Sequence, residues 1–220
     1  MSHLDTEIHL LKEELIEMQR LVRSQLSKCK NALIAFDHDL VAEVLYNEKR
    51  VNALELKIDR DCENILALFN PVAIDLRFVL ATLKINSNLE RIGDNAEGIA
   101  RYVQDLDNPI SSDVLRDYRF KEMYSTAVSM MDDALDALIK EDTSLARKVF
   151  IKDDLLDEIN RAATEMTITN ISDNKLNPLH YLSMLSIIRK FERVGDQTKN
   201  IAEEIIFFIE AKVLKHENKL

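Results

Sequence analysis

Apolar residues recur along most of the chain at alternating intervals of three and four residues, the spacing that places them on one face of an α-helix. Short polar or proline-containing stretches interrupt these stripes. Only three glycines and three prolines occur among the 220 residues, which favours long helices over tight turns. The pattern therefore predicts an all-α protein with six long helices, at about residues 4–36, 40–69, 75–106, 114–140, 144–171 and 178–215.

The second half of the chain repeats the pattern of the first half. Glu-Arg-Ile-Gly-Asp at residues 90–94 returns as Glu-Arg-Val-Gly-Asp at residues 192–196, which is 102 positions later. Apolar positions around the first string map at this offset onto the second, and the two preceding helices match at an offset of 105. The clearest linker is residues 107–113. We therefore predict two tandem antiparallel three-helix bundles related by internal duplication, one in residues 1–108 and one in residues 109–220.

The repeated string places two carboxylates on each of the equivalent helices. Glu90 and Asp94 are four residues apart, as are Glu192 and Asp196, so each pair lies on one helix face, away from the apolar stripe. One such pair is usually a solvated surface. Recurrence of the whole string favours a function, and so does its glycine, which costs about 1 kcal/mol relative to alanine in a helix interior. Close helix packing at the glycine is the structural alternative.

The second and fifth predicted helices add further acidic groups. A polar line at helical spacing follows the second helix through Glu48, Asn52, Glu55 and Asp59. At the offset of 105, Glu48 and Asn52 correspond to Asp153 and Asp157. If these faces meet the repeated strings, about four oxygen-bearing side chains converge in each half. Burial and mutual repulsion raise the pKa values of such carboxyl groups, so protons or a cation must relieve the charge. An all-oxygen set favours hard ions such as Fe(III), Mn(II), Mg(II) or Ca(II) over a structural zinc.

Charge and cysteine content narrow the possible environments and partners. The formal net charge of −10 argues against nucleic-acid binding, which requires a cationic surface. Cys29 and Cys62 lie in apolar stripes and read as reduced core thiols, so a cytoplasmic location is expected. The first residues are too charged for a signal peptide. No apolar run approaches the roughly 20 residues that a transmembrane segment needs.

These motifs resemble those of the PhoU family, the accessory regulators of bacterial phosphate uptake. The resemblance covers almost the whole chain: its length, the duplicated three-helix plan, the repeated string, and Pro71 followed by Asp75-Leu76-Arg77 and Lys84. It implies metal clusters held by paired acidic motifs on neighbouring helices, with iron expected first and manganese, magnesium, calcium or zinc as alternatives. The implied first site is Glu48, Asn52, Glu90 and Asp94, and the implied second site is Asp153, Asp157, Glu192 and Asp196. Since Asn52 makes the first site less anionic, the second is expected to be the better one.

The resemblance also implies a role in signalling. Members of the family act in the cytoplasm, often as homodimers, and link the phosphate-specific transporter ATPase to a membrane sensor histidine kinase. The chain is thus expected to be a non-catalytic adaptor that signals phosphate sufficiency and limits uptake. One alternative is a di-metal carboxylate enzyme, although such bundles carry His three residues after the ligand Glu, where this chain has Gly93 and Gly195. The other is a plain helical scaffold without metal.

Overall fold

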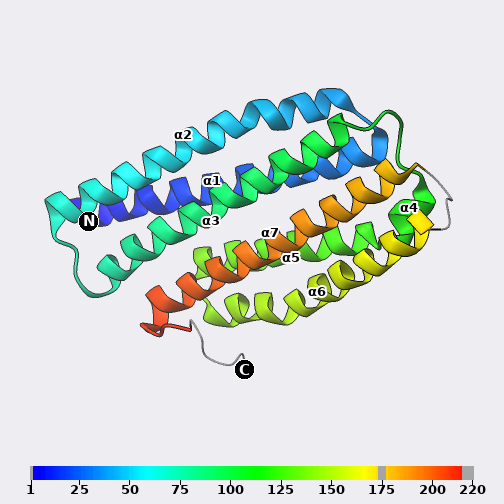
Figure 1. The fold of residues 1–220 in the computed structure, drawn as a ribbon. Coiled ribbons are helices and arrows are strands. Elements are labelled where there is room, and N and C mark those ends of the chain that lie inside the picture. Colours follow the sequence, from blue (N-terminus) through cyan, green and yellow to red (C-terminus); the bar gives the residue numbers. More distant parts are fainter. Residues whose placement is uncertain (1, 173–176, 215–220) are drawn as a thin grey trace.

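The computed structural model describes residues 2–172 and 177–214, and within these ranges every regular element is a helix (Figure 1). The first half contains α1 (His3–Ala35), α2 (His38–Phe69) and α3 (Ala73–Gln104). The second half contains α4 (Ser112–Asp117), α5 (Phe120–Lys140), α6 (Thr143–Ser172) and α7 (Pro178–Glu210). The predicted all-α fold of two three-helix repeats is confirmed, with the short α4 as an addition.

Polar side chains and left-handed residues set most helix ends close to the predicted positions. Ser2 and Asp5 form a reciprocal capping box at the start of α1. Asp37 caps α2 by accepting hydrogen bonds from the backbone N–H groups of Asp39 and Leu40. Asn70 ends α2 in the left-handed conformation, directly before Pro71.

Two predicted helix limits were wrong. The helix expected over residues 114–140 is broken between α4 and α5, where Arg119 has a φ of 50°. The turn buries the Tyr118 ring between α6 and α7, with its hydroxyl 2.6 Å from that of Thr167, and Arg119 is held by ion pairs to acidic side chains at 2.7 and 2.6 Å. Helix α7 ends at Glu210 and not near residue 215, so Lys212 lies beyond the helix. Lys215 is outside the described residues.

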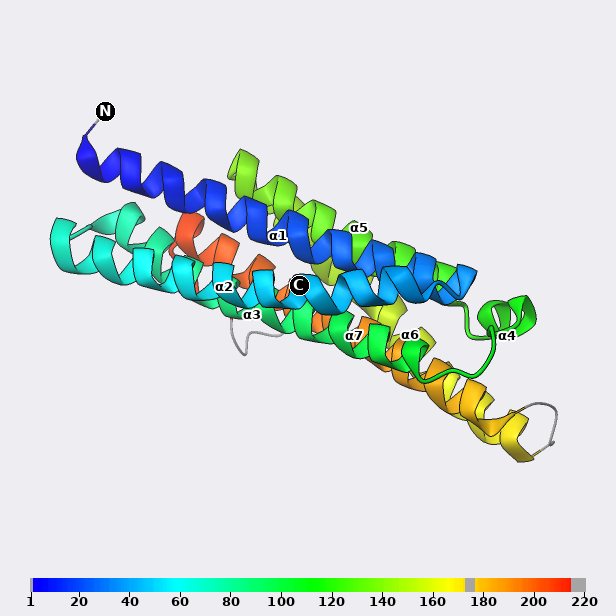
Figure 2. The same ribbon diagram turned by 90° about the horizontal axis from the view of Figure 1, so that it is seen from above.

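The two halves lie side by side around a central antiparallel pair of helices. Helix α3 runs along α7 and α1 runs along α5, while α2 and α6 lie on opposite outer sides (Figures 1 and 2). Side chains join the pairs directly: Gln19 on α1 donates to the carbonyl of Met131 on α5 at 2.7 Å. Apolar residues from both halves form one continuous core. Burial of that shared core holds the halves together.

Contacts between α3 and α7 occur in pairs that are related by the internal duplication. Asn200 donates to the side-chain oxygen of Asn88 at 3.2 Å. The positions equivalent to this pair, 102 residues away in each direction, are Gly98 and Lys190, and they also meet. The two contacts therefore lie symmetrically about the centre of the helix pair, where the repeated strings are level with each other. The fold thus places both acidic strings at the middle of the molecule.

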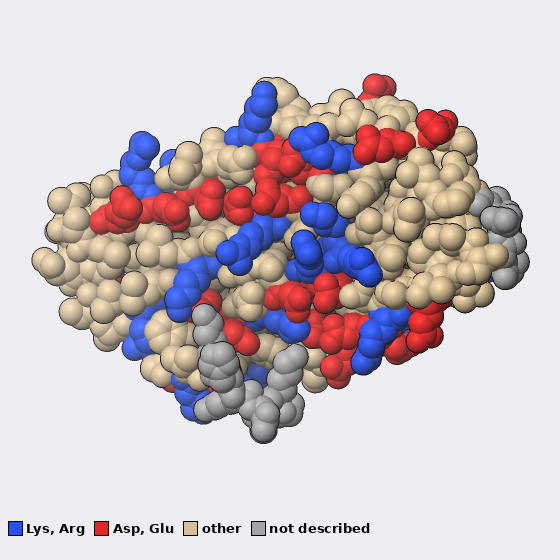
Figure 3. Space-filling model, in the orientation of Figure 1, with Lys and Arg blue, Asp and Glu red and all other residues tan. Residues whose placement is uncertain are grey.

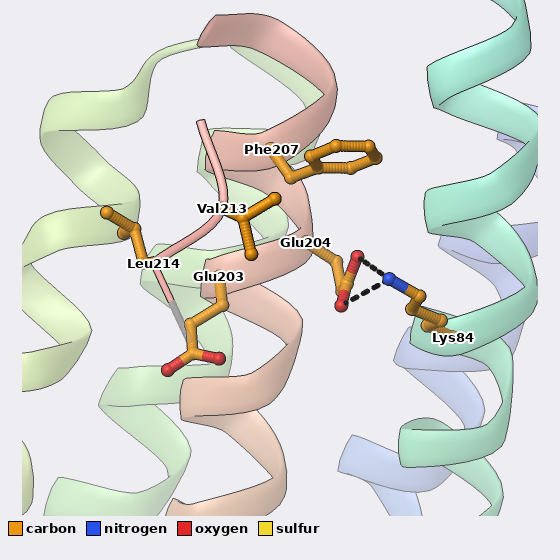
Figure 4. A pocket seen from close by; sticks show the side chains of 6 residues that line it. All are labelled: Lys84, Glu203, Glu204, Phe207, Val213 and Leu214. Atoms are coloured by element: carbon orange, nitrogen blue, oxygen red, sulfur yellow. Dashed lines mark hydrogen bonds and ion pairs between the residues drawn. The ribbon is translucent and has the colours of Figure 1, made fainter. Parts of the chain in front are cut away.

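Arg77 and Lys84, two of the residues on which the resemblance rests, join α3 to α7. Lys84 on α3 lies 3.0 and 3.1 Å from the two carboxylate oxygens of Glu204 on α7, beside Phe207 (Figure 4). Arg77 donates to the backbone carbonyl of Phe208 at 3.0 Å, near the end of α7. These contacts join the two halves and lie apart from the acidic strings.

Candidate functional site

Glu48 is the centre of the first-half acidic cluster. Its side chain projects from α2 toward α3 and the residue is 5% exposed. Within the described residues neither carboxylate oxygen makes a hydrogen bond of standard geometry, although the side chain of Gln25 lies close enough to lower its pKa. Gly93 of the repeated string makes room for it: a Cβ at Gly93 would lie 3.2 Å from Glu48 Oε2 and 3.0 Å from Val51 Cγ1. The internal glycine therefore allows α3 to approach a buried carboxyl group on α2.

Other acids of α3 surround this group. Burial, followed by the charges of Asp94, Glu97 and Glu90, raises the pKa of Glu48 to about 7, against a lowering by the side chain of Gln25 on α1. Burial also raises the pKa of Glu90, with Asp94 next in effect. A proton or a cation that binds here reduces the repulsion between the carboxylates and is therefore favourable.

Glu55 extends the first-half cluster along α2. Burial raises its pKa, and Asp59 and Asp94 raise it further. The predicted set omitted both Glu55 and Glu97, although each lies seven residues after another cluster member, Glu48 or Glu90, and thus on the same helix face. Asn52, which was predicted as a ligand, is exposed. The first-half cluster is defined here as Glu48, Glu55, Glu90, Asp94 and Glu97.

On the face of the molecule seen in Figure 3, acidic side chains form two bands, one toward α2 and one toward α6. Lys and Arg side chains lie between the two bands. Within the described residues, no three His, Cys, Asp or Glu side chains are arranged to coordinate one metal ion together. Binding of a cation by several carboxylates therefore requires exposed groups such as Asp94 to rotate toward Glu48.

The second-half cluster consists of Asp153, Asp157, Glu192 and Asp196, and it has a lysine at its centre. Asp153 on α6 is 1% exposed, and the ammonium group of Lys199 on α7 lies 2.5 Å from its Oδ2 and 2.8 Å from Asp196 Oδ1. Burial alone would lower the pKa of Lys199, but hydrogen bonds to both aspartates outweigh this and raise it. A fixed positive charge thus lies between two of the four predicted ligands.

The remaining predicted ligands of the second half lie close by. Burial raises the pKa of Glu192, and Asp196 and Asp157 raise it further. The fold therefore brings Asp153, Asp157, Glu192 and Asp196 into one region between α6 and α7. Sequence reasoning missed Lys199, although its position shows where the duplication fails: the equivalent residue in the first half is Glu97.

The glycines make a testable contrast. A Cβ at Gly195 would lie 2.4 Å from Cδ1 of Leu156, which is fully buried, whereas one at Gly98 would meet only the flexible end of Lys190. We expect Gly195→Ala to lower the free energy of unfolding by about 1–2 kcal/mol because the core resists the added methyl group. Gly98→Ala should raise it by up to about 1 kcal/mol through helix propensity. Urea unfolding of both variants checks this; equal effects would contradict the packing role of Gly195.

Together, the fold and the two clusters define a duplicated all-α protein with an acidic region between two helices of each repeat. The family model described as "PhoU domain" matches residues 15–103 and again residues 120–205. A "Phosphate-specific transport system accessory protein PhoU homolog" of Burkholderia sp is 32% identical over 98% of this chain and 92% of its own length. The chain therefore belongs to the PhoU family.

Solved structures agree with this assignment. The crystal structure of "the phosphate transport system regulatory protein PhoU" from Streptococcus pneumoniae is similar with a TM-score of 0.87 and 28% identity, over 96% of this chain and 99% of that one. The crystal structure of PhoU from Pseudomonas aeruginosa has the same TM-score at 29% identity, over 96% and 100%. Across the described parts of this chain, no helix combines the length and apolarity needed to cross a membrane.

Proposed function

We propose that this chain is a non-catalytic cytoplasmic regulator of phosphate uptake. It acts, as a homodimer, as an adaptor between the phosphate-specific transporter ATPase and a membrane sensor histidine kinase, and it restrains uptake when phosphate is sufficient. The observation that supports this most is the nearly full-length similarity to relatives named as accessory or regulatory proteins of phosphate transport. Two repeats that share one core suit an adaptor, since each repeat can present a surface to a different partner.

The proposal includes a metal ion at the first-half cluster. Two features of the residues fit a cation: the carboxylate of Glu48 is buried without a hydrogen bond of standard geometry, and the neighbouring charged groups are carboxylates. Hard ions such as iron, manganese, magnesium or calcium prefer such donors. Glu48, Glu90 and Asp94 would hold the ion, with Glu55 and Glu97 nearby.

A bound cation would supply positive charge that relieves the repulsion and links α2 to α3. Bundle enzymes with two metals carry histidine three residues after the ligand glutamate, whereas this chain has glycine at both of these positions. The geometry therefore favours a structural or regulatory ion over an enzyme centre.

A strain lacking this gene tests the regulatory role. In phosphate-rich medium, we expect the deletion to derepress phosphate-uptake genes at least several-fold, and a plasmid copy of the wild-type gene to restore repression. Transcript levels of the transporter genes, measured in rich and phosphate-poor medium, provide the readout. Normal repression in the deletion strain would contradict the proposed function.

A further inference from the structure

The two halves differ in charge at several pairs of equivalent positions, and at one of these pairs the sign of the charge is reversed. Glu97 on α3 and Lys199 on α7 are separated by 102 residues, the offset of the repeated strings. The same duplication replaces Glu55 by Asn160 at the offset of 105. The first-half cluster thus has five carboxylates, a formal charge of −5, whereas the second half has four carboxylates and one ammonium group, a formal charge of −3.

The ammonium group of Lys199 lies between two carboxylates of the second half. It is hydrogen-bonded to the buried Asp153 at 2.5 Å and to Asp196 at 2.8 Å, and the lysine side chain is 15% exposed. Charge-assisted hydrogen bonds of this length are among the strongest in proteins. In the first half, by contrast, the charged groups that act on the buried Glu48 are the carboxylates of Asp94, Glu97 and Glu90.

We propose that Lys199 is a built-in cation that replaces a metal ion in the second half, so that only the first-half cluster binds a divalent cation. This inference rests on the metal binding included in the proposed function. It reverses the expectation from sequence that the second half holds the better site.

The physical reason is competition at close range. Lys199 is tethered to the same helix as Asp196, so its effective concentration at the aspartates far exceeds that of a free ion. A metal ion that displaced the ammonium group would also leave that positive charge buried or next to the metal, where like charges repel. Lys152 cannot supply such a group to the cluster, because it is held by Ser129 and Asp133 on α5.

Exchange of the two charges tests the inference. We expect the wild-type protein to bind one equivalent of Mn²⁺ per chain in calorimetric titration, and Glu97→Lys to weaken this binding at least tenfold. Lys199→Glu should bind a second equivalent. Lys199→Gln, which keeps a similar length and polarity, serves as a second variant if the charge reversal impairs folding. Circular dichroism without metal verifies that each variant is folded.

Line broadening of backbone amide signals by the paramagnetic Mn²⁺ locates each ion. In the wild-type protein, broadening should centre on α2 and α3, and in Lys199→Glu it should also include α6 and α7. Two matched variants separate the halves: Glu48→Gln should abolish wild-type binding, whereas Asp153→Asn should leave it unchanged within twofold.

The outcomes distinguish the two claims. If the wild-type protein binds no Mn²⁺ but a folded Lys199 variant binds one equivalent at α6 and α7, the first-half metal is wrong and the role of Lys199 stands. If the broadening by wild-type Mn²⁺ is centred on α6, which lies on the opposite outer side from α2, and binding is lost in Asp153→Asn, the role of Lys199 is overturned. If folded Lys199 variants gain no site, it is overturned as well, whatever the wild-type protein binds.

Discussion

Lys199→Met should lower the free energy of unfolding by about 2–4 kcal/mol in metal-free protein near pH 7.5, since the substitution removes the positive charge that contacts the buried Asp153. Removal of one member of a buried ion pair is costly because the other charge stays in a poorly solvated place. For a chain of this size, the melting temperature should fall by roughly 5–15 °C. Thermal unfolding followed by circular dichroism provides the measurement.

Lys140→Met is the matched control for this prediction. Lys140 also forms an ion pair with an aspartate at 2.6 Å, but both side chains are more than half exposed. Exposed pairs of this kind contribute about 0.2–1 kcal/mol, and many contribute nothing measurable. The control should therefore shift the melting temperature by at most a few degrees. An equal shift in the two variants would show that Lys199 acts as an ordinary surface lysine, and would weaken the case for a built-in cation.

The helical plan could be predicted from the sequence because nearly every core residue repeats at intervals of three and four. The interruption after α4 could not. The apolar stripe over residues 114–140 continues through the break, and Arg119 adopts its left-handed conformation so that Tyr118 can pack between α6 and α7. A contact with residues about 50 positions away decides the local backbone there, and no local pattern contains that information.

The candidate sites were predictable in part for a similar reason. Seven-residue spacing places Glu48 and Glu55 almost in line on α2, whereas Asn52 is rotated outward by about 40° from Glu48. The buried neighbours of Glu48 at four residues before and three after, Val44 and Val51, define which side meets α3. The sequence pattern on that side could therefore have added Glu55 to the predicted set, in which Asn52 remains an untested prediction. The pairing of Lys199 with Asp153 depends on how α6 and α7 pack, so it required the structure.

The contrast between the halves has a consequence for regulation by metal. In the second half the positive charge belongs to Lys199, which is part of the chain, so its ion pairs with Asp153 and Asp196 do not depend on added metal. In the first half, relief of the negative charge depends on protons or on an added cation, since the neighbouring acids raise the pKa of Glu48 and of Glu90. A change in metal occupancy should therefore alter the packing of α2 on α3 and leave the other half unaffected.

Glu48→Gln should have opposite effects on stability with and without metal. Burial and the nearby acids of α3 raise the pKa of Glu48 in the folded protein to about 7, above the ordinary value of 4.5. Between these values the folded state binds more protons than the unfolded state, so the stabilisation from the neutral carboxyl group is complete below about pH 4.5 and is lost as the pH rises through about 7. At pH 8 in EDTA, the variant should exceed the wild-type protein by about 2 kcal/mol.

The difference should shrink toward zero as the pH falls to 5, where the wild-type carboxyl group takes up its proton. Addition of Mn²⁺ at pH 8 should stabilise the wild-type protein and leave Glu48→Gln unchanged, because a neutral amide cannot replace the buried carboxylate as a ligand of similar strength. Glu63→Gln is the control, since Glu63 is an exposed residue of the same helix. Urea unfolding at pH 5 and pH 8, with EDTA or Mn²⁺, measures all four conditions. If the stability difference between Glu48→Gln and wild type is the same at both pH values, Glu48 is not the buried, charge-strained acid on which the first-half site depends.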